Sequence, residues 1–343
     1  MRVGVLTGGG DCPGLNAVIR AIVRKAERHY QDSVLGFLDG WRGVLEGDFI
    51  ELDVERMRGT LPRGGTVLGT SRVSPRMYDD GIDRVGSTMA SAGIDALIVI
   101  GGEGTLSAAV GVQTAGAANV VGVPKTIDND IGLTELTFGF DTAVGVATAA
   151  IDRLHTTAES HDRVMVVEVM GRHVGHIATW AGIAGGATLT LIPEDPFDIN
   201  AVAETIIRRH RNGKWASIVV VAEGARPAEG TLELPPPDID QFGHIRLGGI
   251  GQVVAAEIEA RTGFDARVTV LGHIQRGGTP SALDRVLCSW YGIAAIDAVH
   301  DGDWGSMVAF RGGEMVRVRL DQAVAELKPV NPALYEVARA FFA

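Results

Sequence analysis

The sequence has only two cysteines, no long apolar run and no excess of positive charge. Two cysteines, Cys12 and Cys288, are too few for a disulfide framework, and the N-terminus shows no signal-peptide pattern, so we expect a reducing cytoplasm. No apolar stretch approaches the roughly 20 residues that a membrane-spanning helix needs, so no membrane partner is expected. The formal net charge of −11 argues against general binding to nucleic acid.

The distribution of apolar residues predicts an α/β protein. Short β-branched runs alternate with amphipathic stretches of helical length, which is typical of right-handed βαβ units and mostly parallel sheets. The predicted strands are 3–6, 34–38, 96–100, 120–123, 164–169, 189–192, 218–221, 268–271 and 307–310. The predicted helices are 15–27, 144–157, 201–210, 251–261, 282–299 and 332–342.

Two Rossmann-like lobes are predicted, because 343 residues exceed the length at which one core usually stops growing. The rhythm of helices and strands breaks near residues 138–142 and then restarts. The larger lobe is expected to comprise residues 1–138 with 268–305, and the smaller lobe residues 139–267 with 306–343. Residues 226–249, which include three consecutive prolines at 235–237, are expected to form a surface loop.

The most informative segment is Pro124-Lys125-Thr126-Ile127-Asp128-Asn129-Asp130. It places two carboxylates, a hydroxyl and a cation directly behind an apolar run that reads as a buried strand. In an open parallel sheet, ligands bind at the carboxyl ends of the strands. The segment therefore predicts chemistry at that edge of the sheet.

A second glycine-rich turn, Gly101-Gly102-Glu103-Gly104-Thr105, lies between another apolar run and a helical pattern. Backbone amides at such a turn can hold phosphate, and missing side chains allow a close approach. Glu103 adds a carboxylate that can bind Mg²⁺ bridged to phosphate oxygens. The alternative is a plain strand-to-helix turn, and both the Walker A motif and the protein-kinase catalytic loop are absent.

The opening turn, Gly8-Gly9-Gly10-Asp11-Cys12-Pro13-Gly14, occupies the position of a dinucleotide fingerprint. Asp39 even resembles the ribose-binding acid of that motif. However, the third glycine is misplaced, and Asp11 would bring a carboxylate toward the pyrophosphate. A nicotinamide-dependent oxidoreductase is therefore a minor alternative, and a turn that serves only tight packing is the stronger one.

Arginines recur at strand ends and in glycine-flanked loops. Guanidinium groups in such positions can grip phosphate through paired hydrogen bonds, although any single one could be a surface ion pair. The four that stand out are Arg72, Arg163, Arg172 and Arg276.

Together these segments resemble the phosphofructokinase family. The matching motifs are the opening Gly-Gly-Asp turn, Gly-Gly-Glu-Gly-Thr, Pro-Lys-Thr-Ile-Asp-Asn-Asp, Val-Glu-Val-Met-Gly-Arg and Leu-Gly-His-Ile-Gln-Arg-Gly-Gly, in order between Val3 and about Ala298. The resemblance implies a phosphofructokinase-like fold whose larger lobe binds the donor and whose smaller lobe binds the sugar phosphate. It also implies Mg²⁺-dependent transfer of a phosphoryl group to the 1-hydroxyl of fructose 6-phosphate, which is a step of glycolysis.

The resemblance assigns roles residue by residue. Asp128 would be the base that accepts the proton of the sugar hydroxyl, with Thr126 and Arg172 as the other catalytic residues and Glu103 as the metal ligand. The residues implied to bind the donor are Gly10, Arg72, Gly102, Glu103, Gly104, Thr105 and Lys125. Those implied to bind the sugar phosphate are Thr126, Asp128, Asp130, Arg163, Met170, Gly171, Arg172, Glu223, Arg267, His273 and Arg276.

Two of these residues, Arg163 and Arg267, match positions that reach the 6-phosphate from a neighbouring subunit in the family. A homotetramer, or a homodimer, is therefore expected.

The identity of the phosphoryl donor rests on two residues that point in opposite directions. Family members that use ATP keep glycine at the position of Gly104, whereas users of pyrophosphate usually have aspartate there. Lys125 is typical of pyrophosphate users. We give the steric effect at Gly104 more weight, which predicts ATP as donor and keeps pyrophosphate as the alternative.

Allosteric regulation is expected to be weak. Arg20, Arg24 and Lys214 match effector-site cations of compact bacterial members, but charged effector ligands are replaced at three positions, Val54, His155 and Thr188. A catalytically silent sensor with the same fold is the remaining alternative, and the retained Asp128 and Arg172 argue against it.

Overall fold

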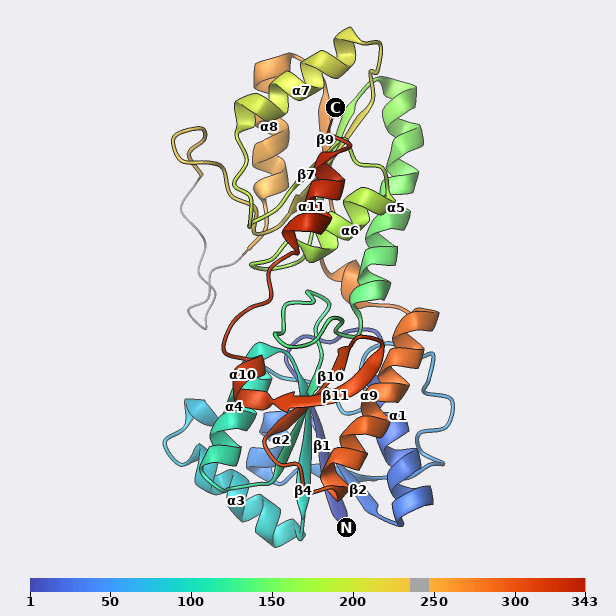
Figure 1. Cartoon of the computed structure of the whole chain (residues 1–343), viewed down its shortest axis with the longest axis vertical. Helices are drawn as coiled ribbons and strands as arrows, with labels where there is room; N and C mark the ends of the chain where they lie inside the picture. Colours follow the sequence, from blue (N-terminus) through green and yellow to red (C-terminus); the bar gives the residue numbers. More distant parts are fainter. Residues whose placement is uncertain (235–246, 343) are drawn as a thin grey trace. The chain divides into compact units, whose positions relative to one another are not determined.

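The structure is a computed structural model that describes residues 1–234 and 247–342. It divides into two compact units (Figure 1). Unit 1 comprises Met1–Thr142 and Arg276–Lys328, and unit 2 comprises Ala143–Gln275 and Pro329–Ala343. The predicted proline-rich part of the surface loop, residues 235–237, lies outside the described residues.

Unit 1 contains a seven-stranded sheet in the order β11-β10-β5-β4-β1-β2-β3. Five strands run parallel, and the two edge strands β3 and β11 are antiparallel to their neighbours. The strands are β1 (Arg2–Gly8), β2 (Ser33–Phe37), β3 (Phe49–Leu52), β4 (Ala96–Gly101), β5 (Val120–Pro124), β10 (Ser306–Arg311) and β11 (Glu314–Arg319).

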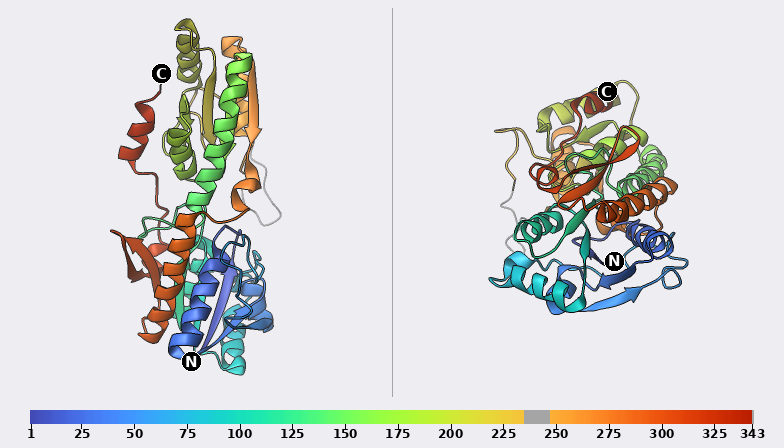
Figure 2. Two further views of the ribbon diagram at one scale, coloured as in Figure 1. Left: turned by 90° about the vertical axis from the view of Figure 1, so that its right-hand side faces the viewer. Right: turned by 60° about the horizontal axis from the view of Figure 1, so that its bottom comes forward.

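Helices cover both faces of this sheet (Figure 2). One layer holds α1 (Leu15–Lys25) and α9 (Ala282–His300), which pack against each other. The other holds α2 (Trp41–Glu46), α3 (Gly81–Ala92), α4 (Glu103–Thr114) and α10 (Leu320–Ala323). Short π and 3₁₀ turns lie at η1 (Ala26–Tyr30) and η2 (Pro75–Met77). The core between the sheet and the second layer is apolar and fully enclosed around Val99, Leu106 and Val120.

Unit 2 contains a four-stranded parallel sheet in the order β7-β8-β6-β9. Its strands are β6 (Val164–Val169), β7 (Leu189–Leu191), β8 (Ser217–Ala222) and β9 (Ala266–Val270). The helices are α5 (Phe140–His161), which begins at the end of unit 1, α6 (His176–Ala184), α7 (Ile199–Arg211), α8 (Ile250–Thr262) and α11 (Pro332–Arg339). The 3₁₀ turn η3 (Gly272–Arg276) ends this part of the chain. Its core is built on fully enclosed β-branched residues such as Val166, Val219 and Val254.

The observed units confirm the predicted α/β class, but all three lobe boundaries differ from the predicted ones. Residues 139–142 belong to unit 1 and not to the smaller lobe. Residues 306–328 belong to unit 1 and not to the smaller lobe, because β10 pairs in parallel with β5 and carries β11 with it. Residues 268–275 belong to unit 2, because β9 pairs with β6. Hydrogen bonding between strands distant in the sequence decides the last two assignments, and a local sequence pattern does not report it.

Candidate active site

The segment after β5 forms a tight turn in unit 1 that locks one of its two carboxylates. The Thr126 hydroxyl lies 3.2 Å from Oδ2 of Asp128, and the Asp128 amide donates to that hydroxyl oxygen at 3.0 Å. The Thr126 carbonyl accepts the Thr137 hydroxyl at 2.7 Å. Both Thr126 and Asp128 are buried. The turn is therefore held from both ends.

The other oxygen of this carboxylate is unusual. Oδ1 of Asp128 is enclosed and has no hydrogen-bond partner within the described part of the chain. A buried carboxylate oxygen without a partner is costly, and a catalytic role is one of the recognised explanations for such an atom in a folded protein. Oδ1 is therefore available to accept a hydrogen bond from a bound hydroxyl.

The rest of the loop turns sharply at Asn129, which adopts a left-handed backbone conformation with φ 54°. Asparagine tolerates this region better than most residues. The Asn129 side-chain oxygen accepts the Thr137 amide at 2.9 Å, which closes the loop on itself. Asp130, the second predicted carboxylate, is also buried.

Lys125 reaches from this loop to the opening glycine turn. Its ammonium donates to the Gly10 carbonyl oxygen, and its side chain is buried. Burial lowers the pKa of Lys125, and the guanidinium of Arg276 lowers it further, whereas the carboxylate of Asp128 raises it. The ammonium of Lys125 thus contacts Gly10 and interacts electrostatically with the carboxylate of Asp128.

Arg276 contacts the same turn from another part of the chain. It donates from one guanidinium nitrogen to the Asp11 carbonyl at 3.3 Å. A Cβ atom added at Gly10 would lie 2.6 Å from that nitrogen, so a larger residue there would displace the Arg276 guanidinium from this position. The side chains of Lys125 and Arg276 therefore both line the opening turn.

The neighbouring turn leads into α4, whose N-cap is Gly102. Free backbone N–H groups and the helix dipole make this helix start a favourable place for phosphate. Thr105 is buried, and a Cβ atom added at Gly104 would meet open space within 4 Å. The Glu103 carboxylate is exposed and accepts the Ser107 hydroxyl at 2.9 Å. Donor-binding candidates from β1, β4 and β5 thus meet at one edge of the sheet.

The loop that carries Arg72 lies over the opening turn. Gly9 donates its amide to the Ser71 carbonyl at 3.4 Å, and the Ser71 hydroxyl donates to the Asp39 carbonyl at 2.7 Å. The Asp39 carboxylate forms an ion pair with Arg42. The carboxylate that resembled a ribose-binding acid is thus already paired with Arg42, which weakens the nicotinamide hypothesis.

The predicted sugar-phosphate residues of unit 2 gather after β6 and β8. Glu223 accepts the amides of Gly171 and Arg172 at 3.3 and 3.0 Å, and its own amide donates to the Val169 carbonyl at 2.8 Å. Arg172 has a left-handed backbone with φ 52° and an exposed side chain. Non-glycine residues held in this region recur at functional sites. The Glu223 carboxylate thus fixes the turn from which Arg172 projects.

Two further predicted residues lie near this turn in the fold of unit 2. Met170 is buried, and its amide is 3.4 Å from the Gln275 side-chain oxygen. Gln275 belongs to η3, which also carries the exposed His273. The carboxyl ends of β6, β8 and β9 therefore bring Met170, Arg172 and His273 to one edge of the sheet.

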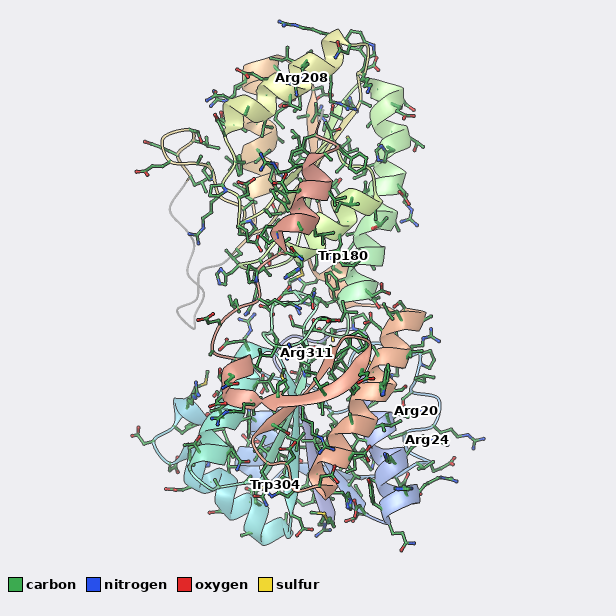
Figure 3. All side chains as sticks on the ribbon, viewed as in Figure 1. Arg20, Arg24, Trp180, Arg208, Trp304 and Arg311 are labelled. Atoms are coloured by element: carbon green, nitrogen blue, oxygen red, sulfur yellow. The ribbon has the colours of Figure 1, made fainter. Side chains whose placement is uncertain are left out.

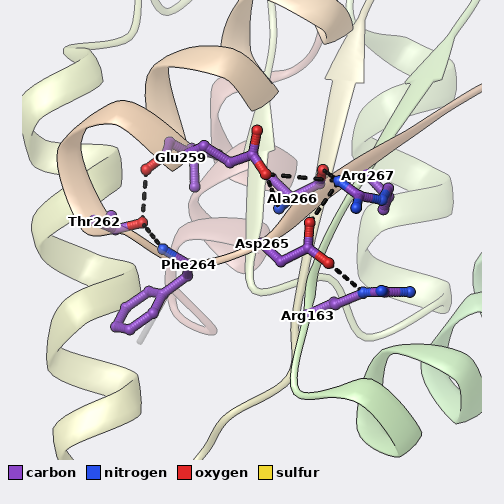
Figure 4. Close-up of polar contacts among 8 residues, drawn as sticks. Arg163, Glu259, Thr262, Phe264, Asp265, Ala266 and Arg267 are labelled. Carbon is purple, nitrogen blue, oxygen red and sulfur yellow. Dashed lines mark hydrogen bonds and ion pairs between the residues drawn. The ribbon is translucent and has the colours of Figure 1, made fainter.

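Arg163 and Arg267 lie close together around Asp265 (Figure 4), at the opposite end of β6 from the turn that carries Arg172. The length of the strand separates the two groups by roughly 20 Å. Both arginines pair with one carboxylate, Asp265: Arg163 through Nε, and Arg267 through a guanidinium nitrogen at 2.5 Å. The structure therefore does not bring these two arginines to the other sugar-phosphate candidates of unit 2.

Several residues of these networks were not predicted from the sequence. Asn129, Thr137 and Lys328 shape the loop of Asp128, and Asp265 pairs the two arginines. Only Asn129 lies within a recognisable motif. Within residues 1–234 and 247–342, no group of three or more His, Cys, Asp or Glu side chains is placed to hold a metal ion. Over the same residues, no helix has the length and apolar character needed to cross a membrane.

Known proteins resemble this chain over nearly its whole length. The family model described as Phosphofructokinase matches residues 2–299. A pyrophosphate–fructose 6-phosphate 1-phosphotransferase from Streptomyces coelicolor is 58% identical over 342 residues and covers 100% of both chains. An ATP-dependent 6-phosphofructokinase from Corynebacterium efficiens is 55% identical and covers 100% of this chain and 99% of the relative.

Solved structures agree on the fold. Phosphofructokinase from Pichia pastoris in the T-state superposes with a TM-score of 0.83 at 31% identity, and the match covers 99% of this chain but 36% of the Pichia chain. A pyrophosphate-dependent phosphofructokinase from Marinobacter aquaeolei has a TM-score of 0.84 at 20% identity, with 100% and 91% of the two chains covered. The fold defines an α/β protein in which two glycine turns follow the neighbouring parallel strands β1 and β4. The chain belongs to the phosphofructokinase family.

Proposed function

We propose that this chain transfers the terminal phosphoryl group of ATP to the 1-hydroxyl of fructose 6-phosphate. The observation that carries the proposal is the buried Oδ1 of Asp128, which has no partner among the described residues and lies behind β5. Family membership supports the substrate, and relatives from Corynebacterium efficiens and Mycobacterium tuberculosis carry the name ATP-dependent 6-phosphofructokinase.

In the proposed reaction, Oδ1 of Asp128 accepts the proton of the sugar hydroxyl as its oxygen attacks the terminal phosphorus. The bond from phosphorus to the bridging oxygen breaks, and ADP leaves with that oxygen. Thr126 holds the other carboxylate oxygen, so the base cannot rotate away. Phosphoryl transfer needs little covalent help, and its rate depends on positioning and on neutralising charge.

The cations around the opening turn supply much of that neutralisation. Lys125 and Arg276 approach the turn from two sides, and the start of α4 adds backbone N–H groups. We assign Gly10, Arg72, Gly102, Gly104 and Thr105 to the donor phosphates with them. Arg172, with Met170, Gly171, Glu223, His273 and Arg276, is assigned to the sugar phosphate.

Mg²⁺ fits this donor set, because it is usually held by one or two carboxylates together with the phosphates of its nucleotide. Glu103 is the residue that would hold it, since its exposed carboxylate begins α4 beside the proposed phosphate site. When bound, the ion would neutralise charge on the transferring group.

Pyrophosphate is the second candidate donor, and a specific observation favours it. The ammonium of Lys125 is buried against the opening turn, where it could stabilise a compact diphosphate. The relative from Streptomyces coelicolor carries the name of a pyrophosphate-dependent enzyme. ATP is preferred because the position of Gly104 is open.

Parallel assays separate these candidates. Purified protein is supplied with fructose 6-phosphate and either ATP or pyrophosphate, and formation of fructose 1,6-bisphosphate is followed. We expect kcat/KM to be higher for ATP. A higher value for pyrophosphate would transfer the proposal to that donor, and no product with either would overturn it.

We also propose that the chain works as a homotetramer. The support is the position of Arg163 and Arg267, at the end of β6 opposite to Arg172, which suits a role at another subunit's site. Sedimentation equilibrium of the purified protein measures the assembly directly. A monomer with full activity would contradict this proposal.

A further inference from the structure

Lys328 is the last residue of unit 1, and its partly buried side chain places the ammonium against the loop that carries Asp128. Nζ donates to the Asn129 side-chain oxygen at 2.9 Å, to the Thr134 carbonyl at 2.8 Å and to the Glu135 carbonyl at 2.9 Å. An ammonium has three N–H donors, and these three acceptors match them in number. One side chain therefore ties three points of the loop together.

The backbone around Lys328 follows the same loop. Its amide donates to the Asp130 carbonyl at 2.8 Å, and Ile131 and Leu327 form an antiparallel bridge. The Gly132 amide donates to the Ala323 carbonyl at 3.1 Å. Residues 323–328, which we call the strap, thus lie along residues 130–135.

Lys328 contacts Asn129, the residue next to the proposed base Asp128. Asn129 follows Asp128 directly and holds its left-handed conformation while its side-chain oxygen binds both Lys328 and the Thr137 amide. The Thr137 hydroxyl in turn donates to the Thr126 carbonyl at 2.7 Å. Removing Lys328 would therefore loosen both sides of the Thr126–Asp128 turn.

We propose that Lys328 is a positioning residue for phosphoryl transfer, which keeps the carboxylate of Asp128 in its reactive orientation by holding Asn129, Thr134 and Glu135. The inference rests on the proposed function. It extends that function to a residue about two hundred positions away in the sequence, outside the motifs that carry the resemblance.

The charge of Lys328 makes this role sensitive to pH. Burial lowers its pKa to about 8, while the carboxylates of Asp130 and Glu135 partly oppose the shift. The Tyr291 hydroxyl, which lies 2.9 Å from Thr134, stays neutral because burial raises its pKa. Loss of the Lys328 proton leaves two donors for three acceptors, so we expect kcat to fall as the pH rises through about 8.

Stability should change in the opposite direction over the same range. The pKa of Lys328 is lower in the folded chain than in the unfolded chain, so the unfolded chain binds more protons between about pH 8 and pH 10.4. The contribution of Lys328 to the free energy of unfolding therefore rises with pH while activity falls. A role in stability alone would not produce this opposition.

The test uses full-length protein and the variants Lys328→Met and Lys328→Arg, with Glu326→Gln as matched control. Glu326 lies on the same strap with an exposed side chain. We expect Lys328→Met to lower kcat by about 10- to 100-fold with KM for fructose 6-phosphate changed less than about threefold. The fall of kcat with a midpoint near pH 8, which we expect in wild type, should be absent from Lys328→Met. In Lys328→Arg this fall of kcat should move to higher pH. Glu326→Gln should resemble wild type.

Hydrogen exchange of residues 130–137 without substrate is the second measurement. Lys328→Met should exchange these amides faster than wild type, and Lys328→Arg should restore part of the protection. Wild-type kcat together with unchanged exchange in Lys328→Met would overturn the inference. If wild type transfers no phosphoryl group, the proposed function and the positioning role both fail. Exchange then still shows whether Lys328 holds the loop.

Discussion

Thr126 and Asp128 hold each other through a reciprocal pair of hydrogen bonds. The threonine hydroxyl lies 3.2 Å from Oδ2 of the carboxylate, and the aspartate amide donates to that hydroxyl oxygen at 3.0 Å. One oxygen of the carboxylate is thereby fixed, which leaves the other with a defined direction. This arrangement suits a general base, because proton transfer requires a base within hydrogen-bond reach of the reacting hydroxyl.

The substitution Gly104→Asp tests the donor preference. A side chain at this position meets open space in the protein, so the fold should tolerate it. If ATP occupies the start of α4, the new carboxylate would clash with it, and we expect kcat/KM for ATP to fall at least about tenfold more than that for pyrophosphate. Gly104→Ala, which adds a side chain without charge, is the control. Equal losses with both donors would contradict the steric explanation.

A response to allosteric effectors should be weak. Arg20 and Arg24 lie on α1 (Figure 3), but His155 and Thr188, which stand where the resemblance leads us to expect charged effector ligands, have internal partners in unit 2. His155 Nε2 lies 2.6 Å from the Gly185 carbonyl oxygen, and the Thr188 hydroxyl accepts the Ile218 amide at 3.2 Å.

Few charged groups are then left to bind a phosphate effector there. Phosphoenolpyruvate, which is not a reactant, should change kcat/KM by less than about twofold, and ADP should act only as a product inhibitor. Sigmoidal kinetics that either compound strongly shifts would contradict this expectation.

The buried carboxylate of Asp284 is expected to be important for stability. It accepts the Gly139 amide at 2.8 Å, the Thr142 amide at 2.9 Å and the Thr142 hydroxyl at 2.5 Å, where α5 begins. Asp284→Ala leaves these buried donors without an acceptor, so the free energy of unfolding should fall by about 2–4 kcal/mol. Urea denaturation measures this change, with the exposed Asp79→Ala as control. A loss no larger than that of the control would show that water replaces the carboxylate.

The sequence predicted the parallel strands of both units and missed the two antiparallel edges. β3 is short and only partly buried, and β11 alternates charged and apolar residues, so neither has the continuous apolar run of a strand buried on both faces. Helix α3 was also missed. It contains two glycines, at 81 and 86, which weaken the helical pattern.

The candidate site was predictable where it lies in contiguous motifs and unpredictable where it depends on tertiary contact. Residues 124–130 and 101–105 can be recognised from their residue types alone. The partners of that loop do not: Lys328 contacts Asn129 from 199 positions further along the chain, because α10 and the strap return to the carboxyl end of β5. Similarly, no local pattern indicated that Arg163 and Arg267 share Asp265.

The most direct test of the central claim is the kinetics of Asp128→Asn. Asparagine keeps the size of the side chain but cannot accept the proton, so we expect kcat to fall by roughly 10²- to 10⁴-fold with little change in the affinity for fructose 6-phosphate. Thermal unfolding of the variant controls for loss of the fold. An unchanged kcat, or a loss confined to KM, would remove Asp128 from the role of general base.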